Sequence, residues 1–203
     1  AFESVRKKGI LPDMVAGHSL GEYAAMVASG ILTLEDGYRV IKARAKAMGE
    51  CAARHPGAMC AVMGCTNEEI SEVCAAVDGY AAPVNFNSAV QTVVAGEVAA
   101  IDAAVAAFTE KGKKAVKLAV SAAFHTPLMQ EAADAFYQDI RAIPFAAPSV
   151  AFYSNTTGAQ MTDFSDMPSY LAKHLVSPVG FGEELHANQD AGAGRFIECG
   201  PGK

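Results

Sequence analysis

The first third of the chain alternates a short apolar run with two stretches whose apolar residues recur at helical spacing. The run at 14–17 predicts a buried strand, and a helix is expected at 20–29, where a glycine ends it. A capping pattern at Thr33–Asp36 then predicts a long amphipathic helix to about Ala53. The apolar positions that define its expected buried face are Leu34, Tyr38, Ile41, Ala45 and Met48.

The middle of the chain changes to shorter segments in the order strand, helix, strand, strand, helix, strand. That order is typical of a ferredoxin-like unit, so residues 57–121 are expected to form a compact insert. A capping box at Thr66–Glu69 opens the first of its helices. The predicted strands are 59–63, 84–87, 92–95 and 115–120, and the predicted helices are 66–77 and 97–111.

After the insert, the pattern predicts a return to the first unit. Residues 1–56 and 122–203 would then form one larger α/β unit that the insert at 57–121 interrupts. The chain opens in what is interpreted as a helix tail and stops in a turn, so we expect a piece of a longer protein, truncated at both ends. The elements expected in this last part are a helix from Thr126-Pro127, a strand at 150–154, a helix at 167–175 and a strand at 195–199.

The composition narrows the class of protein. With 51% hydrophobic and 19% charged residues, the 203-residue chain can bury a real core. A formal net charge of -6 argues against nucleic acid as a partner, and no apolar run reaches the roughly 18 residues of a membrane span. An odd number of cysteines without a C-x-x-C pair predicts buried thiols of a reducing compartment and therefore a cytoplasmic protein. The cysteines are Cys51, Cys60, Cys65, Cys74 and Cys199.

One short motif carries the main chemical signal. The segment Gly17-His18-Ser19-Leu20-Gly21 fits G-x-S-x-G and lies between an apolar run and a helix. A sharp turn there would expose the Ser19 hydroxyl, and small residues at both glycine positions would relieve the strained backbone. The N–H of Leu20, at the helix start, is the expected oxyanion donor. The alternative is a glycine-rich turn that only opens a helix.

A nucleophilic serine needs a base, and the chain offers five histidines. His125 is favoured because a strand-like run, 115–123, meets a helix start beside it, which would place it on the sheet rim near Ser19. The alternative for His125 is an ordinary polar residue at a helix start. The other histidines are His18 beside the serine, His55 in a loop, His174 on a late helix and His186 in a polar stretch.

Taken together, the motifs resemble a known family. The segment 17–23 is similar to the nucleophile motif of malonyl-CoA:acyl carrier protein transacylases and of acyltransferase domains of fatty acid and polyketide synthases. Asn85-Phe86-Asn87-Ser88 with Gln91 and Gly96, Ala123-Phe124-His125, and the closing residues 198–203 resemble further motifs of the family in the right order. The resemblance implies an α/β-hydrolase-like large domain with a parallel sheet, interrupted by a ferredoxin-like small domain.

The resemblance also assigns roles to residues. It makes Ser19 the nucleophile, His125 the general base and acid, and Leu20 an oxyanion donor. Arg44 matches the arginine that grips the free malonyl carboxylate, although the residues alone favour a solvated helix arginine beside the apolar stripe. The further substrate-binding residues that the resemblance implies are His18, Asn85, Asn87, Phe124 and His174.

Two departures from the family pattern affect these roles. The second oxyanion donor comes from a glutamine in an N-terminal G-Q-G motif that this sequence does not contain. His174 stands where many members have glutamine, but the family role belongs to a backbone carbonyl that orients the catalytic histidine, so we expect that role to persist. A second catalytic histidine at this position is the open alternative.

The resemblance also bears on the choice of acyl group. Leu20 and Phe124 match members of the family that prefer malonyl over methylmalonyl.

The function expected from the resemblance is a two-step transfer in fatty acid biosynthesis. A malonyl group would pass from malonyl-CoA to Ser19 and then to the phosphopantetheine thiol of acyl carrier protein. No metal and no tightly bound cofactor are expected, and the expected partners are acyl carrier protein and coenzyme A thioesters, not nucleic acid or membrane. The alternatives are an acyltransferase domain of a polyketide synthase, a serine ester hydrolase, and a non-catalytic domain that docks carrier protein.

Overall fold

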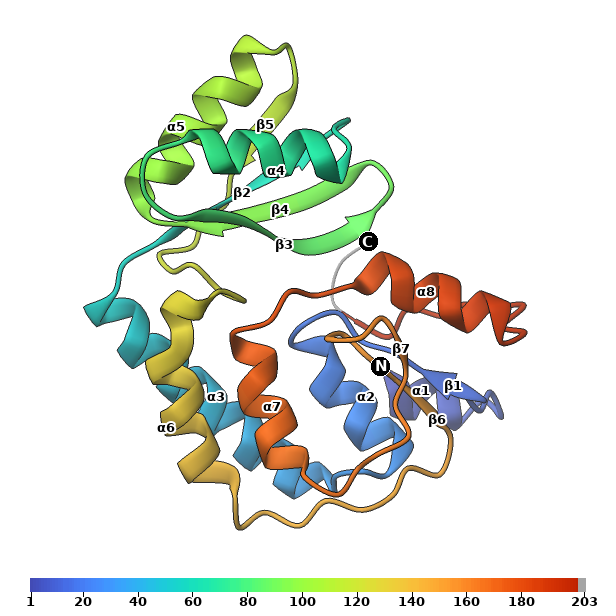
Figure 1. Ribbon diagram of the computed structural model, residues 1–203. Coiled ribbons are helices and arrows are strands. Elements are labelled where there is room, and N and C mark those ends of the chain that lie inside the picture. The colour runs from blue at the N-terminus through green and yellow to red at the C-terminus, as the bar shows by residue number, and fades with distance from the viewer. Residues whose placement is uncertain (201–203) are drawn as a thin grey trace.

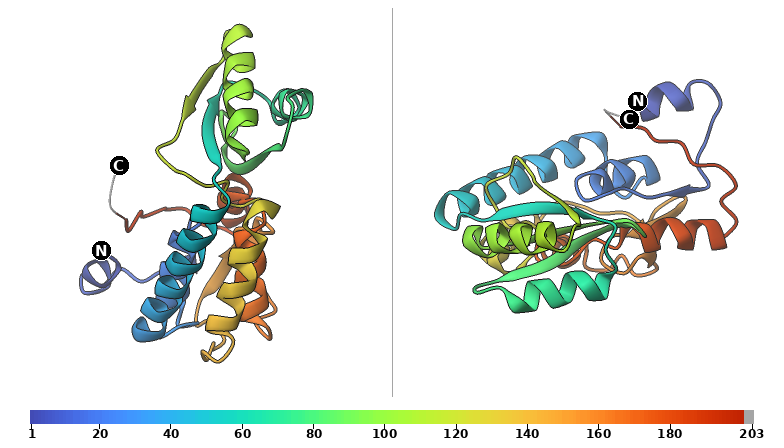
Figure 2. Two further views of the ribbon diagram at one scale, coloured as in Figure 1. Left: turned by 90° about the vertical axis from the view of Figure 1, so that its left-hand side faces the viewer. Right: turned by 90° about the horizontal axis from the view of Figure 1, so that it is seen from above.

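The computed structural model describes residues 1–200, which form two units stacked one above the other (Figures 1 and 2). The chain passes from the first unit to the second after the long helix α3 (Leu34–Arg54) and returns before the 3-10 turn η1 (Pro127–Met129). The α/β class predicted from the sequence is confirmed. Within residues 1–200, no helix is both long enough and apolar enough to cross a membrane.

The first unit packs helices around a small mixed sheet of order β1-β6-β7. β1 pairs parallel with β6 through Val15 and Phe152, whereas β6 and β7 are antiparallel. The expected parallel sheet is therefore limited, among the described residues, to one parallel pair. Apart from α3 and η1, the elements of this unit are α1 (Phe2–Arg6), β1 (Met14–Val15), α2 (Gly21–Ser29), α6 (Gln130–Ile140), β6 (Ala151–Ser154), β7 (Ala159–Gln160), α7 (Met167–Leu175) and α8 (Phe181–Asp190).

The second unit is an antiparallel sheet of order β3-β4-β2-β5 with two helices on one face (Figure 1). Its side chains alternate between two cores. Cys60 and Val62 face the helices, where Phe108 is fully buried, while Met59 and Ala61 face the other way. The elements are β2 (Ala58–Met63), α4 (Asn67–Ala76), β3 (Ala81–Ser88), β4 (Gln91–Gly96), α5 (Val98–Glu110) and β5 (Lys114–Lys117).

The face of this sheet away from the helices covers the first unit. Met59 and Ala61 pack there with Ala123, which precedes η1. Gly57 lies so close to the returning chain that a Cβ on it would be 2.5 Å from the Ala123 backbone nitrogen. Backbone hydrogen bonds between Val179 and β3 join the units at a second place. The two units are therefore in direct contact at two places, one at Ala123 and one at Val179.

The long helix α3 buries a face that only partly matches the predicted one: Met48 is buried and Ile41 packs against the core, but Leu34, Tyr38 and Ala45 are exposed. Leu34 and Tyr38 are 65% and 70% exposed. α3 packs against α2 and α6, and a Cβ on Gly37 would meet the Val27 side chain at 2.6 Å. The approach of α2 to α3 therefore favours glycine over a larger residue at position 37. The face that is buried consists of Asp36, Gly37, Val40, Arg44, Ala47, Met48 and Cys51.

Several local expectations hold and others fail. The capping box at Thr66–Glu69 is present, and the helix expected at 167–175 has those bounds. The run 115–123 is not one strand, because β5 ends at Lys117 and an irregular segment follows. Residues 195–199 form no strand, since they pair with no other strand among residues 1–200.

The cysteines are also only partly as expected. All five are free, and Cys199 is exposed, whereas the other four are buried.

The helix α8 and the short strand β7 were not predicted, because their residues show neither the helical nor the strand period of apolar residues. Residues 201–203, which belong to the closing motif, lie outside the described part of the chain.

Candidate active site

The turn between β1 and α2 holds Ser19 in a backbone conformation that few non-glycine residues adopt. Its φ is 51°, in the left-handed region. A Cβ on Gly17 would lie 2.2 Å from the carbonyl carbon of Gly21, so the first glycine of the motif is required by close approach. A Cβ on Gly21 would meet nothing within 4 Å. The expectation that both glycines relieve a clash is therefore right for Gly17 and wrong for Gly21.

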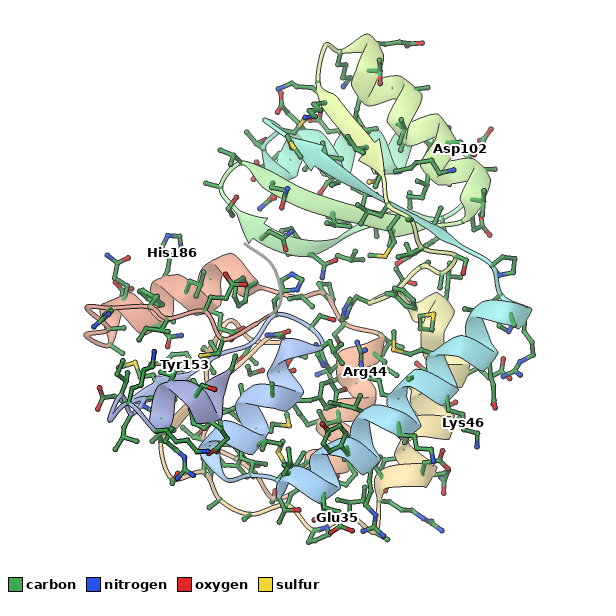
Figure 3. All side chains as sticks on the ribbon, turned by 180° about the vertical axis from the view of Figure 1, so that it is seen from behind. Glu35, Arg44, Lys46, Asp102, Tyr153 and His186 are labelled. Atoms are coloured by element: carbon green, nitrogen blue, oxygen red, sulfur yellow. The ribbon has the colours of Figure 1, made fainter. Side chains whose placement is uncertain are left out.

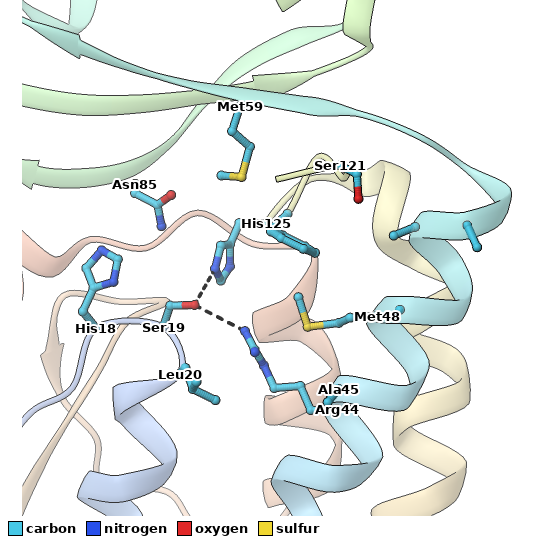
Figure 4. A pocket seen from close by; sticks show the side chains of 14 residues that line it. His18, Ser19, Leu20, Arg44, Ala45, Met48, Met59, Asn85, Ser121 and His125 are labelled. Atoms are coloured by element: carbon cyan, nitrogen blue, oxygen red, sulfur yellow. Dashed lines mark hydrogen bonds between the residues drawn. The ribbon is translucent and has the colours of Figure 1, made fainter. Parts of the chain in front are cut away.

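His125 lies within hydrogen-bond distance of this serine. Its Nε2 is 2.8 Å from Ser19 Oγ (Figure 4). The histidine is carried by the irregular segment after β5 and has a φ of 63°, so it is not the end of a strand as expected. Burial lowers its pKa to about 4, and the nearby Arg44 acts in the same direction. The imidazole is therefore neutral near pH 7 and able to accept a proton.

The other ring nitrogen of His125 contacts the backbone near the end of α7. Nδ1 is 3.1 Å from the carbonyl oxygen of His174. An Nδ1–H that donates to this oxygen fixes the tautomer whose Nε2 lone pair points to Ser19. The contact uses the backbone of His174, which any side chain at this position would preserve.

The side chain of His174 is fully buried, and its ring centroid is 5.3 Å from that of His125. Its Nδ1 is 3.0 Å from Glu22 Oε2, but the two groups are not aligned for a hydrogen bond. Burial lowers the pKa of His174 far below its ordinary value and raises the pKa of Glu22 to about 7. Because burial disfavours the imidazolium, we take the His174 imidazole to be neutral rather than half of an ion pair.

Arg44 points from α3 into the molecule, whereas Lys46 on the same helix points outward (Figure 3). Arg44 is 8% exposed, its Nη2 donates to Ser19 Oγ at 3.3 Å, and its guanidinium lies over the Tyr23 ring. Its Nε has no hydrogen-bond partner, and within residues 1–200 no carboxylate forms an ion pair with it. A buried cation without an anionic partner is unfavourable, so the position favours binding of an anion.

These groups open onto a cavity of about 740 Å³ between the two units (Figure 4). The main chain adds a donor, because the N–H of Leu20 has no acceptor among the described residues, as expected at a helix start. The lining residues are His18, Ser19, Leu20, Arg44, Ala45, Met48, Gly49, Ala52, Ala53, Met59, Asn85, Ser121, Phe124 and His125.

Two of the residues expected to bind substrate do not line this cavity. The His174 side chain is fully buried and is not among the lining residues. Asn87 lies at the edge, where its Oδ1 is 2.8 Å from His18 Nε2 and its Nδ2 donates to Gln91. Asn87 therefore contacts a lining residue across the two units instead of the cavity itself.

A group of buried polar residues behind Ser19 was not found by the sequence analysis. The N–H of Ser19 donates to Asn155 Oδ1 at 2.6 Å, and Asn155 also contacts Glu184 and Glu22. Tyr170 donates a further hydrogen bond to Glu22. One signal was available, since Asn155 directly follows a strand, and functional residues gather at the carboxyl ends of parallel strands. The other residues have no comparable sequence signal.

A serine hydroxyl bonded to a neutral imidazole at a strand-to-helix turn is the arrangement of α/β proteins that use serine as a nucleophile. Comparison with known families agrees and narrows the class. The chain belongs to the acyl transferase domain family, whose profile matches residues 1–202.

Named relatives are found at moderate identity. The chain is 35% identical over 198 residues to the malonyl CoA-acyl carrier protein transacylase of Salmonella typhimurium, covering 96% of this chain and 64% of the relative. The solved malonyl-CoA:acyl carrier protein transacylase of Xanthomonas oryzae superposes with a TM-score of 0.93 at 37% identity, covering 99% of this chain and 65% of that one. The chain thus spans less than two thirds of their length.

A further solved structure shows a relative with its partner. It is a malonyl-transacylase in complex with a type II polyketide synthase acyl-carrier protein. The TM-score is 0.92 at 34% identity, and the match covers 99% of this chain and 66% of that one.

Proposed function

We propose that the complete protein transfers a malonyl group from malonyl-CoA to the phosphopantetheine thiol of an acyl carrier protein in fatty acid biosynthesis. The observation that carries this proposal is the unpaired guanidinium of Arg44, 3.3 Å from a serine that contacts a neutral histidine. Membership of the acyl transferase domain family and the names of the relatives support it.

In the first step, Ser19 is acylated. His125 Nε2 takes the hydroxyl proton as Oγ attacks the thioester carbonyl, and the Leu20 N–H donates to the oxyanion. The carbonyl oxygen of His174 accepts a hydrogen bond from Nδ1–H and so stabilises the imidazolium that forms. The imidazolium then returns its proton to the leaving thiolate of coenzyme A, and the malonyl ester on Ser19 remains.

The second step repeats this chemistry in the other direction. The phosphopantetheine thiol attacks the ester carbonyl and gives its proton to His125 Nε2. The oxyanion collapses, the Ser19 Oγ leaves and takes that proton, and the malonyl thioester of the carrier is released. Every step uses groups of this chain and the two thiols, so the proposal assigns no role to a metal or a tightly bound cofactor.

Arg44 is proposed to choose the acyl group. A malonyl ester on Ser19 ends in a carboxylate, which a guanidinium binds through two parallel charge-assisted hydrogen bonds. An acetyl group would leave the buried cation unpaired. Phe124, half-buried in the cavity wall beside His125, is proposed to exclude the branched methylmalonyl group, and His18 and Asn85 to contact the rest of the substrate.

The same proposal covers the domain arrangement and location. Residues 1–56 and 122–203 would be an α/β-hydrolase-like domain and residues 57–121 a ferredoxin-like insert, supported by separate apolar cores in the two units and by the βαββαβ order. The free cysteines support a reducing, cytoplasmic location.

A second candidate is the same transfer to the carrier protein of a polyketide synthase. The observation that favours it is the solved relative in complex with such a carrier. The two candidates share every residue of the site and differ only in the carrier, so relative rates with the two kinds of carrier would separate them. An ester hydrolase is disfavoured because hydrolysis needs no unpaired guanidinium beside the nucleophile.

Acylation is tested by incubating the full-length protein with malonyl-CoA and measuring its intact mass. We expect a malonyl adduct on the wild type and none on Ser19→Ala. Ser121→Ala is the matched control, because Ser121 is an exposed serine of the same cavity wall whose side chain makes no hydrogen bond within the described residues. An adduct that persists in Ser19→Ala would overturn the assignment of the nucleophile.

A further inference from the structure

Two fully buried side chains, Asn155 and Glu184, lie directly behind the nucleophile turn and outside the cavity. Asn155 directly follows β6, the parallel neighbour of the strand that leads to Ser19. Glu184 lies on α8, a helix whose residues are mostly polar. Neither residue has a part in the chemistry described above.

These two side chains bind three backbone groups of the turn. The N–H of Ser19 donates to Asn155 Oδ1 at 2.6 Å. Asn155 Nδ2 donates to the carbonyl oxygen of Gly17 and to Glu184 Oε2, both at 2.7 Å. Glu184 Oε1 accepts from the N–H of Gly17 at 3.2 Å. The residues on either side of His18 are thus held by side chains from the far end of the sequence.

The turn needs such support because Ser19 is strained. A non-glycine residue with a positive φ persists only where its surroundings fix it. If Ser19 relaxed to a common backbone conformation, its Oγ would move away from His125 Nε2, which is now 2.8 Å distant. The hydroxyl would then lose its base while the cavity and Arg44 stayed as they are.

We propose that Asn155 and Glu184 are positioning residues that hold Ser19 in its strained conformation and thereby set its reactivity. The proposal rests on the proposed function, in which Ser19 is the nucleophile. The positioning role goes beyond the proposed function because neither residue lines the cavity in which a substrate would bind.

The hydrogen-bond pattern assigns a definite chemical form to each partner. Both oxygens of Glu184 accept from N–H groups, which is the pattern of a carboxylate. Burial raises the pKa of Glu184 to about 8, whereas its N–H donors oppose that change. We take the group to be ionised, because both of its oxygens face N–H donors and no hydrogen bond among the described residues offers an acceptor for a carboxyl proton.

The pattern yields a swap experiment. Glu184→Gln puts an amide donor against an N–H of Asn155 or Gly17, and Asn155→Asp puts a second carboxylate against Glu184. The double variant Asn155→Asp/Glu184→Gln moves the charge to position 155 and restores a donor–acceptor contact between the two side chains. The only contact it leaves unmade is the one to the Gly17 carbonyl.

The experiment compares these variants in the full-length protein. Each single variant should slow malonylation of Ser19 at least about tenfold with KM for malonyl-CoA nearly unchanged, and the double variant should regain part of the rate. Asn188→Ala is the matched control, because Asn188 is also buried on α8 but bonds only the backbone of Glu184. It should react like the wild type.

A fluorophosphonate that labels nucleophilic serines, applied to the same proteins, separates this proposal from the proposed function. Slower labelling of the single variants would support positioning even if the wild type took no malonyl group. Absence of malonylation in the wild type would refute only the proposed substrate. Single variants that react like the wild type with both reagents would overturn the proposal. A double variant no better than the slower single variant, or an equal loss in Asn188→Ala, would overturn it too.

Discussion

The two units of the molecule bury different kinds of residue. The core between the sheet and helices of the second unit is made of aliphatic, cysteine and phenylalanine side chains. In the first unit, by contrast, Glu22, Arg44, His125, His174 and Glu184 are all buried close to Ser19. Every buried side-chain atom without a hydrogen-bond partner in residues 1–200 also belongs to this unit. The helix-covered core of the second unit is thus apolar, whereas the first unit gives up part of its apolar packing to hold polar and charged groups beside Ser19.

The largest effect on the acylation rate is expected from loss of His125, the proposed base in the first unit. His125→Ala should slow acylation of Ser19 by about 10²–10⁴-fold, because an unassisted serine hydroxyl is a poor nucleophile. Stopped-flow measurement of coenzyme A release would give the rate. His174→Gln should change it little, since the carbonyl that contacts His125 belongs to the backbone. An equal loss in both variants would instead favour a catalytic imidazole at position 174.

A core substitution in the second unit should affect stability and leave the chemistry alone. Phe108 is fully buried between α5 and the sheet, so Phe108→Ala should lower the free energy of unfolding by about 3–5 kcal/mol. Denaturant titration measures this change, and the acylation rate per folded molecule should stay that of the wild type. A large fall in that rate would show that the helix-covered core of the second unit also shapes the site.

The buried cation of the first unit should set the choice of acyl group. Arg44→Ala should weaken malonyl transfer by about 2–5 kcal/mol in kcat/KM and raise relative use of acetyl-CoA, because the carboxylate loses its partner. Arg39→Ala is the matched control on the same helix, exposed and paired with Asp36. Competition between malonyl-CoA, methylmalonyl-CoA and acetyl-CoA measures the preference. Wild-type protein that uses acetyl and malonyl equally would refute this role.

The smallest effect concerns pH. Because the pKa of His125 is lowered from 6.5 to about 4, the base stays neutral as pH falls from 7 to 5. Acylation should therefore decline only as pH approaches 4, where the imidazole gains its proton. The pH profile of single-turnover acylation checks this. A decline centred near 6.5 would mean that the imidazole is not desolvated.

The same contrast explains what the sequence could predict. In the second unit the apolar period and the Thr66–Glu69 capping box lead to the observed order of elements, because packing there follows the apolar residues. In the first unit the buried face of α3 was predicted only in part, since Met48 is buried as expected, but α3 also buries Arg44 and leaves Leu34 and Tyr38 exposed. Apolar periodicity cannot identify a helix face that is buried because it carries a charged residue or because a neighbouring helix approaches it closely.

The candidate site divides in a similar way. Motifs led to Ser19 and His125, and the family resemblance led to Arg44; the structure brings His125 and Arg44 within hydrogen-bond distance of the Ser19 hydroxyl. Asn155 and Glu184 escaped because an isolated Asn or Glu gives no pattern, and only the fold places them behind the turn. The strand expected at 195–199 failed because apolar residues alone do not supply a partner strand.

The central claim is that Ser19 carries the acyl group between two thiols. The most direct measurement is peptide mapping of the full-length protein after malonyl-CoA, followed by addition of phosphopantetheine-bearing acyl carrier protein. We predict a malonyl ester only on the peptide that contains Ser19, and its quantitative appearance on the carrier after the second addition. An ester on another residue, or one lost to water without reaching the carrier, would contradict the account.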